Sequence, residues 1–415
     1  MRIGIVSQWF PPEPAFIPGS LAGELARRGH DVRVLTGFPN YPGGVLYPGF
    51  RQRWRHRQRQ DGVTVRRVPL FASHDNSGLR RAANYLSFAA SSSAAALPYL
   101  RDADVLYVYH PPATAAAAAL LVHLARRTPL VLHVQDVWPD AVTASTMAPS
   151  GTAGRLLHGA LGTVMRHLYA TAAAVVVIAP GLRDLLIDRG VDPAKVHTSL
   201  NWTDETVFRP APPAAAGDLV RPGRCTVMYA GNLGHFQGLD TAVRAARATD
   251  RDGVDLLLVG SGVQETRLRA LAADLGTGNV RFAGRRPAAH VAGLHASADF
   301  QLVSLRALPL LSAVIPSKLP AALACAAPVI VSAAGDAANI VHDAGAGLVC
   351  PPEDTDALAQ RFLDAAAMPV DGRRAAGERA RVAYQTDMRM QLGVDRIERL
   401  LTSAARRDTP VVTGR

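Results

Sequence analysis

The sequence has few cysteines and no long hydrophobic run. Its three cysteines, Cys225, Cys325 and Cys350, lie far apart in a chain of 415 residues. This spacing argues against a disulfide framework and against a zinc site, and it suits a reducing compartment. The longest apolar run, 113–122, is shorter than the roughly 20 residues that a membrane-spanning helix needs. No apolar run of signal-peptide length follows Arg2. We therefore expect a cytoplasmic protein, with any membrane contact peripheral and at the inner face of the cell membrane.

Lysine is almost absent. The chain has 45 lysines and arginines, and only Lys195 and Lys318 among them are lysine. The formal net charge of +11, concentrated in the first half of the chain, favours anionic partners such as phosphorylated substrates or acidic lipid headgroups.

Short apolar runs alternate with Ala- and Leu-rich helical repeats in two sets. Each set indicates a parallel sheet covered by helices on both faces. A stretch rich in proline, alanine and glycine separates the sets. We predict an α/β fold with two doubly wound, Rossmann-like domains facing across a cleft. The predicted parts are a first domain at 1–208, a linker at 209–224, a second domain at 225–385 and a last helix at about 386–405 that packs back on the first domain.

Three positions in the first half could take part in chemistry. Gly19 lies where the first helix is expected to begin, and backbone amides at a helix start bind anions. His110 ends an apolar strand, where a histidine can carry a proton, although a packed or solvated side chain is the commoner outcome. Asp136 ends the next strand in the stretch HVQDVWPDA. His133 lies on the opposite face of that strand, so the two side chains are not expected to share one environment.

The second half offers a glycine-rich loop and the isolated lysine. Gly231 and Asn232 begin the strand-to-helix loop YAGNLGHFQGLDT, which suits a diphosphate. Gly260 and Gly262 form a short Gly-x-Gly that we interpret as a tight turn. Lys318 follows Pro316 and Ser317 at a helix start, where the helix dipole disfavours a cation unless a bound anion compensates. This position predicts a phosphate contact.

Arginines alternate along the stretch RQRWRHRQRQ. The period of two predicts a strand or hairpin with one cationic face. Contact with anionic lipid headgroups or a pyrophosphate-bearing acceptor is the functional interpretation, and a solvated face is the alternative. No base-stacking motif accompanies the run, so nucleic acid is not expected. The candidate residues for acceptor or membrane contact are Arg51, Arg53 and Arg55.

These loops, in this order, resemble the family-4 type glycosyltransferases of the GT-B class, in particular the subgroup that builds bacterial polysaccharides and lipid-linked oligosaccharides. The matching text includes FPPEP, HVQDVWPDA, YAGNLGHFQGLDT, LLLVGSG and PSKLP, and it spans most of the chain. The resemblance implies transfer of a sugar from a nucleoside diphosphate sugar to a hydrophobic or lipid-linked glycan acceptor, with retention at the anomeric carbon and without a bound metal or other cofactor. It implies an acceptor-side first domain and a second domain that binds the nucleotide sugar.

Residue by residue, the resemblance assigns two groups. The catalytic residues on the acceptor side would be His110 and Asp136. The donor-binding residues would be Gly19, Gly231, Asn232, Arg306, Ser317 and Lys318. One departure stands out, because the two glutamates that the family usually carries around this helix are replaced by Ala313 and Ala321. The alternatives are therefore a non-catalytic partner protein of the same fold that binds a sugar nucleotide or escorts an active transferase, and a sugar-nucleotide epimerase.

Overall fold

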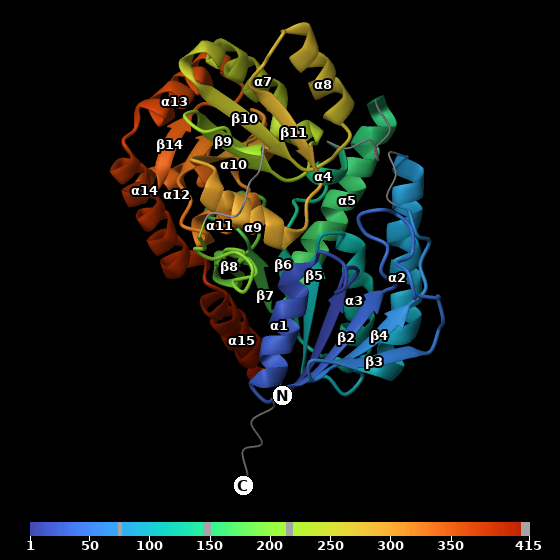
Figure 1. Cartoon of the computed structure of the whole chain (residues 1–415). Helices are drawn as coiled ribbons and strands as arrows, with labels where there is room; N and C mark the ends of the chain where they lie inside the picture. The colour runs from blue at the N-terminus through green and yellow to red at the C-terminus, as the bar shows by residue number, and fades with distance from the viewer. Residues whose placement is uncertain (74–76, 144–150, 213–218, 408–415) are drawn as a thin grey trace. The chain divides into compact units, whose positions relative to one another are not determined.

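The computed structural model describes residues 1–73, 77–143, 151–212 and 219–407. The chain forms two compact units (Figure 1). Unit 1 holds Met1–Ser199 and the chain from Gln391 onward, and unit 2 holds Leu200–Met390. Residues 213–218 of the expected linker lie outside the described residues. Among the described helices, none combines the length and apolarity needed to cross a bilayer.

Unit 1 is built on one sheet whose strands follow the order β3-β4-β2-β1-β5-β6-β7-β8. Every neighbouring pair is parallel except β3 and β4, and the central strands are almost fully buried, as apolar runs covered on both faces must be. The strands are β1 (Arg2–Ser7), β2 (Asp31–Gly37), β3 (His56–Gln60), β4 (Val63–Val68), β5 (Val105–His110), β6 (Leu130–Val134), β7 (Ala174–Val177) and β8 (Val196–Thr198).

Helices of unit 1 connect these strands. Two of them, α2 and α3, lie side by side (Figure 1). The helices are α1 (Phe16–Arg27), α2 (Gly78–Leu100), α3 (Ala116–Arg126), α4 (Asp140–Thr143), α5 (Gly151–Thr171), α6 (Pro180–Asp188) and α15 (Met390–Arg407). The strand order reverses between β1 and β5, and in open α/β sheets ligands bind beyond the carboxyl ends of the strands at such a switch point.

The arginine-rich segment is only partly a strand. β3 begins at His56 and forms a hairpin with β4 through Asp61 and Gly62, whose φ angles of 51° and 79° suit a two-residue hairpin turn. Arg51, Arg53 and Arg55 precede the strand. The expected single cationic strand face is therefore wrong for these three residues, because pairing with β4 starts only at His56.

The last helix packs within unit 1. Arg28, at the end of α1, forms ion pairs with Asp395 (2.7 Å) and Glu398 (2.5 Å) of α15. His30 lies 2.7 Å from the other oxygen of Glu398. Four apolar residues at helical spacing are buried along the same helix, namely Val394, Ile397, Leu401 and Ala404. These contacts attach the C-terminal helix to the first helix of the chain.

Unit 2 is built on a parallel sheet with the order β11-β10-β9-β12-β13-β14. In chain order this is the 3-2-1-4-5-6 arrangement of a dinucleotide-binding fold, with its switch point between β9 and β12. The strands are β9 (Cys225–Ala230), β10 (Val254–Val259), β11 (Val280–Gly284), β12 (Phe300–Ser304), β13 (Val329–Ser332) and β14 (Gly347–Cys350). The helices are α7 (Leu239–Ala248), α8 (Glu265–Asp274), α9 (Ala288–Ser297), α10 (Pro309–Ser312), α11 (Lys318–Ala324), α12 (Asp336–Asp343), α13 (Thr355–Ala367) and α14 (Val370–Ala383).

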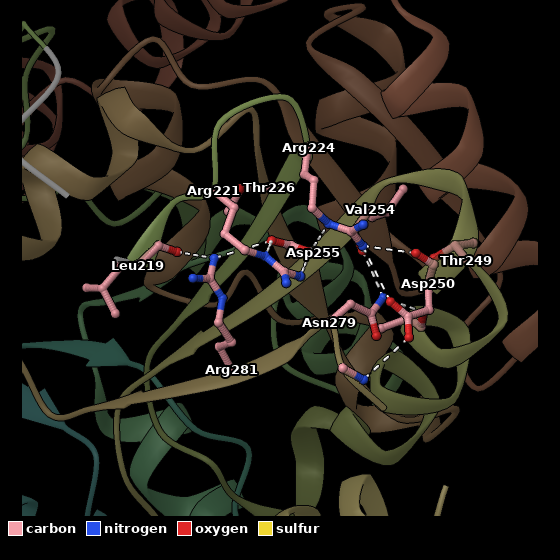
Figure 2. Close-up of polar contacts among 12 residues, drawn as sticks. Leu219, Arg221, Arg224, Thr226, Thr249, Asp250, Val254, Asp255, Asn279 and Arg281 are labelled. Carbon is pink, nitrogen blue, oxygen red and sulfur yellow. Dashed lines mark hydrogen bonds and ion pairs between the residues drawn. The ribbon is translucent and has the colours of Figure 1, made fainter. Parts of the chain in front are cut away.

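A buried carboxylate fixes the start of this sheet. Asp255 on β10 is fully buried and pairs with three arginines, as Figure 2 shows. Arg221 and Arg224 come from the segment that leads into β9, and Arg281 comes from β11. Arg224 also donates hydrogen bonds to the carbonyls of Asp250 and Val254, each at 3.0 Å. Three partly exposed arginines around one buried carboxylate therefore hold the entry to unit 2 in place.

Candidate functional site

Two glycine-containing loops, which follow the neighbouring strands β9 and β10, lie backbone against backbone at the carboxyl edge of the sheet of unit 2. A Cβ on Gly260 would lie 1.8 Å from the carbonyl oxygen of Gly231, and one on Gly262 would lie 2.4 Å from that of Leu233. The Leu233 amide donates to the Ser261 carbonyl at 3.0 Å. The loop after β9 therefore depends on glycines after β10. Interpreting 260–262 as a tight turn missed this packing role.

Lys318 is the first residue of α11 and lies against the first of these loops. Its Nζ is 4.7 Å from the centre of the Tyr229 ring. A Cβ on Gly231 would lie 3.3 Å from Lys318 Cε and 3.8 Å from Nζ. The structure thus brings together two of the predicted donor residues, which are 87 positions apart in the chain's numbering.

The ammonium group of Lys318 has no compensating charge. Among the residues that the structure describes, no carboxylate forms an ion pair with it. The side chain is half-buried, and this burial lowers the pKa of Lys318 to about 8. An unpaired, desolvated cation at the start of a helix is unfavourable on its own. A bound anion would relieve that cost, so the position is suited to a phosphate group.

Polar groups surround the lysine. Gly231, Asn232 and Ser317 are exposed. The Tyr229 hydroxyl donates to the Asn232 carbonyl at 2.6 Å, which fixes the loop just beyond the strand. The Ser317 side chain makes no capping hydrogen bond to α11. Loop amides and a hydroxyl beside one amine form a set that can bind phosphate oxygens.

Arg306 has a structural role in this conformation. Its Nε donates to the His235 carbonyl at 2.7 Å, Nη1 to Glu353 at 2.5 Å and Nη2 to Asp240 at 3.0 Å. The guanidinium therefore joins the loop after β9 to α7 and to the segment after β14. Two carboxylates neutralise its charge, and a contact between Arg306 and the donor stays a prediction.

The two alanines at the positions of the family's usual glutamates are packed. Ala313 follows α10 and Ala321 lies within α11, and each is only 7% exposed. Near Ala313 the chain is tight, because a Cβ on Gly335 would lie 2.0 Å from the Ser312 carbonyl oxygen. Neither position can supply a charged hydrogen-bond acceptor to a ligand.

Gly19 lies inside the first helix of unit 1, and not at its start. Helix α1 begins at Phe16, so the expected boundary was three residues late. A Cβ on Gly19 would lie 2.5 Å from Cγ of Pro11, so the glycine allows the preceding loop to pack on the helix. Its expected contact with the donor stays a prediction.

His110 is fully buried at the end of β5. Neither ring nitrogen has a hydrogen-bond partner within the described structure, and burial lowers the pKa of His110 to about 4. The imidazole is therefore neutral near pH 7 and is not exposed to solvent in this conformation. Its assignment as a catalytic residue stays a prediction.

Asp136 follows β6 and its side chain is exposed. The surrounding protein nevertheless raises the pKa of Asp136 to about 6 through desolvation. His133 on β6 is buried, with Nδ1 2.5 Å from the Tyr107 hydroxyl and Nε2 3.0 Å from the Gln135 amide. The environments of the two residues differ, because His133 is fully buried and Asp136 is exposed. Only Asp136 of the pair is placed to meet a ligand.

Aromatic side chains that sequence reasoning did not single out lie beside Asp136 in unit 1. Trp9 follows β1, Tyr41 follows β2, and Tyr85 belongs to α2. The Trp9 ring centre lies 4.7 Å from that of Tyr41 and 6.4 Å from that of Tyr85. Trp9 and Tyr41 belong to the stretches SQWFPPEP and FPNYPGG, so the signal was present as aromatic residues in the loops that follow predicted strands.

The three arginines before β3 are fully on the surface. Arg51, Arg53 and Arg55 are exposed, and Trp54 between them is 55% exposed. Cationic side chains around an exposed tryptophan are typical of surfaces that contact lipid headgroups. Membrane contact at this segment stays a prediction.

Comparison with protein families gives two matches in chain order. Residues 17–202 match the model described as glycosyl transferase 4-like domain. Residues 224–367 match the model described as glycosyl transferases group 1. The first match lies almost wholly in unit 1 and the second lies in unit 2, and together they cover most of the chain.

Among curated proteins, the chain is 26% identical over 382 residues to WcaI of Escherichia coli K12, a protein named for glycosyl transfer in colanic acid biosynthesis. The match covers 89% of this chain and 93% of that protein. Among solved structures, it is similar to a sucrose-phosphate synthase from Thermosynechococcus elongatus, with a TM-score of 0.75, 18% identity and coverage of 97% and 98%. It is also similar to HepE of Anabaena in complex with UDP and glucose, with a TM-score of 0.71, 17% identity and coverage of 97% and 100%. The fold is GT-B, and the chain belongs to the family-4 type glycosyltransferases.

Proposed function

We propose that this glycosyltransferase moves a sugar from a nucleoside diphosphate sugar to a hydrophobic or lipid-linked glycan acceptor, with retention at the anomeric carbon. The observation that carries the proposal is the unpaired ammonium of Lys318 beside the Gly231 loop. A departing nucleoside diphosphate needs positive charge fixed in advance, and such electrostatic stabilisation is commonly the largest single contribution to catalysis.

One similar protein supports the proposed donor, and another supports the proposed acceptor. HepE of Anabaena was solved with UDP and with UDP-glucose, which supports a nucleoside diphosphate as the ligand of the second unit. WcaI is named for the synthesis of colanic acid, which supports a glycan product. We propose that Lys318 and the amides of the Gly231 loop neutralise the diphosphate without a resident metal ion, and that Asp136 faces the acceptor.

The replacement of the two usual glutamates by Ala313 and Ala321 changes how the donor is held. Losing a charge-assisted hydrogen bond to a ribose hydroxyl costs roughly 1.5–3 kcal/mol. We therefore propose weak donor binding in the absence of acceptor, with Lys318 and the glycine loop providing most of the affinity.

Replacement of Lys318 tests the proposal. Lys318→Ala should lower the rate of sugar transfer by roughly a hundredfold or more, because loss of one group that stabilises the leaving charge has that effect. Lys195→Ala is the matched control, since it removes the chain's other lysine, whose Nζ donates to the Ala170 carbonyl at 2.8 Å. A screen of nucleotide sugars with product analysis gives the rate and the anomeric configuration, and added EDTA should leave the rate unchanged. Full turnover by Lys318→Ala would contradict the proposal.

We also propose that the segment around Trp54 contacts anionic lipid at the inner face of the cell membrane. Changing Arg51, Arg53 and Arg55 together to serine should weaken binding to vesicles containing phosphatidylglycerol by roughly a hundredfold at low salt, at about 1 kcal/mol for each basic residue. The effect should shrink as salt rises. Vesicle cosedimentation measures it, and equal binding by the triple variant would show that the arginines form only a solvated face.

A further inference from the structure

Three aromatic residues of unit 1 are each preceded by a buried amide. Gln8, Asn40 and Asn84 come directly before Trp9, Tyr41 and Tyr85 in the chain, and these amides are at most 1% exposed. Gln8 Nε2 donates to Asn84 Oδ1 at 2.5 Å, and Asn84 Nδ2 donates to Asn40 Oδ1 at 3.3 Å. The amide network therefore fixes three separate segments of the chain relative to one another.

The three aromatic rings lie together where those segments meet, and they are half-buried. The centres of the Trp9 and Tyr41 rings are 4.7 Å apart with planes inclined by 31°, so no ligand ring fits between them. Tyr85 meets Trp9 edge-on at 6.4 Å and also lies 6.4 Å from buried Trp138. The result is a rigid aromatic surface beyond the carboxyl ends of β1, β2 and β6, close to the switch point of the sheet.

A charged group without a partner lies beside this surface. Arg81 precedes Tyr85 by one turn of α2, so both side chains lie on the same face of the helix. Nε and Nη2 of Arg81 are buried, and neither has a hydrogen-bond partner within the described structure. Leaving a buried donor unsatisfied is unfavourable, and guanidinium matches the geometry of phosphate.

Asp136 also lies near the Tyr85 phenol. Burial raises the pKa of Tyr85, Arg81 opposes this rise, and Asp136 adds to it, which places both charges near the hydroxyl. A ligand on the aromatic surface would therefore meet a cation and a hydrogen-bond acceptor. An apolar chain would leave both of these groups unsatisfied, whereas a sugar offers an apolar C–H face to the rings and hydroxyls to Asp136.

We propose that Trp9, Tyr41 and Tyr85 form a stacking surface for the acceptor sugar, and that Arg81 binds a phosphate attached to that sugar. The acceptor is then a glycosyl phosphate, and the subsite recognises the sugar and its phosphate together. This inference rests on the proposed transfer and names the acceptor class for it.

Calorimetry on the full chain tests the subsite with defined probes. The soluble probes are the 1-phosphates of glucose, galactose and N-acetylglucosamine, each compared with its methyl glycoside. The same sugars on farnesyl diphosphate form the lipid arm, and farnesyl diphosphate without a sugar is the apolar control. Similar affinities for the soluble and lipid forms would show that the sugar phosphate alone is recognised. Tighter binding of the lipid form would identify a lipid-linked acceptor as the source.

Two pairs of variants of α2 separate stacking from charge. Arg81→Gln should weaken a bound hexose 1-phosphate about tenfold and leave its methyl glycoside unchanged. Arg80→Gln, which removes the adjacent arginine that lies 5.9 Å from the Phe71 ring centre, should change either probe by less than twofold. Tyr85→Ala should weaken both probes about fivefold, whereas Tyr85→Phe should keep the stacking and stay within twofold.

Three outcomes would overturn the inference. They are no binding of any glycosyl phosphate in either arm, equal losses of affinity for Arg81→Gln and Arg80→Gln, and binding of farnesyl diphosphate as tight as that of its glycosylated forms.

UDP and GDP titrations on every variant keep this inference separate from the proposed function. If nucleotides bind in a way that depends on Lys318 but no glycosyl phosphate binds, only the proposed acceptor subsite is wrong. If a glycosyl phosphate binds in a way that depends on Arg81 but nucleotide binding does not depend on Lys318, only the proposed donor site is wrong.

Discussion

The two units use the same sheet geometry and build the carboxyl edge of the sheet by different means. In unit 1, side chains hold the loops, because Glu13 and a network of buried amides join segments that carry Trp9 and Tyr41. In unit 2, backbone contacts hold the loops, because glycines allow the chain after β10 to touch the carbonyls after β9. One edge therefore presents a cluster of aromatic rings, and the other presents backbone amides and the amine of Lys318.

This difference matches the two ligands that a sugar transfer needs. An edge made of backbone amides suits the oxygens of a diphosphate, because the donors are fixed and close to the surface. An edge built from aromatic rings suits a sugar ring, because large rigid side chains provide contact area with little loss of conformational entropy. The comparison predicts that backbone changes will damage unit 2 and that polar side-chain changes will damage unit 1.

The largest effect is expected at Gly260. Gly260→Ala would place a Cβ 1.8 Å from the Gly231 carbonyl oxygen at a φ of 141°, which L side chains rarely adopt. We expect a loss of about 4 kcal/mol or more in the free energy of unfolding, and loss of nucleotide binding as the loop is displaced. Chemical denaturation and UDP titration measure the two effects. Gly159→Ala in α5 is the control, where nothing lies within 4 Å of the new Cβ. Equal tolerance at both positions would show that unit 2 does not depend on this close contact.

The corresponding test in unit 1 is Glu13→Gln. Glu13 accepts backbone N–H groups from Asn40 and Tyr41 at 2.8 Å and from Phe10 at 3.1 Å. In the variant, the NH2 group of glutamine would replace one of the two accepting oxygens and face a backbone N–H group. We therefore expect a loss of about 1–3 kcal/mol in the free energy of unfolding.

Glu265→Gln is the control for this test. It removes a helix ion pair to Arg269 at 2.9 Å, and it should cost at most about 0.5 kcal/mol. Urea denaturation, followed by circular dichroism, measures both variants. If Glu13→Gln proves as mild as its control, side-chain hydrogen bonds do not hold the loops of unit 1.

The central strands and the two-sheet organisation could be predicted from the sequence because buried parallel strands are continuous apolar runs. β8 was not predicted, since a three-residue strand has no recognisable pattern. The start of α1 was predicted too late because Pro18 and Gly19 look like a boundary, although proline is tolerated in a first helical turn. The contact between Gly231 and Lys318 was expected only through the family resemblance.

The aromatic surface of unit 1 could not be predicted from one sequence. Gln8 and Asn84 lie 76 positions apart, and only the fold brings their side chains into hydrogen-bonding distance. A pattern of neighbouring amide and aromatic residues has no meaning until the three segments are known to meet. Arg306 shows a similar limit, because the resemblance implies a donor contact, while its pairing with distant Asp240 and Glu353 in this conformation could not be predicted from the sequence.

The smallest expected effect concerns the charge of Lys318 itself. Burial lowers its pKa from the ordinary 10.5 to about 8, so between these values the unfolded chain binds more protons than the folded chain. Stability should therefore rise with pH from about 8 to 10.5 by way of this group. Lys318→Met removes the buried charge, so we expect the variant to be more stable by about 1 kcal/mol at pH 7. That advantage should disappear by pH 10.5, and Lys195→Met should show no such trend. Urea denaturation across this pH range measures the free energy of unfolding of each protein.

In wild type, saturating UDP should abolish the rise in stability with pH, because the nucleotide's phosphates favour the charged amine. If the free energies of unfolding of wild type and Lys318→Met differ by the same amount at every pH, the amine is fully solvated. The edge of unit 2 then has no desolvated cation that an anion would stabilise.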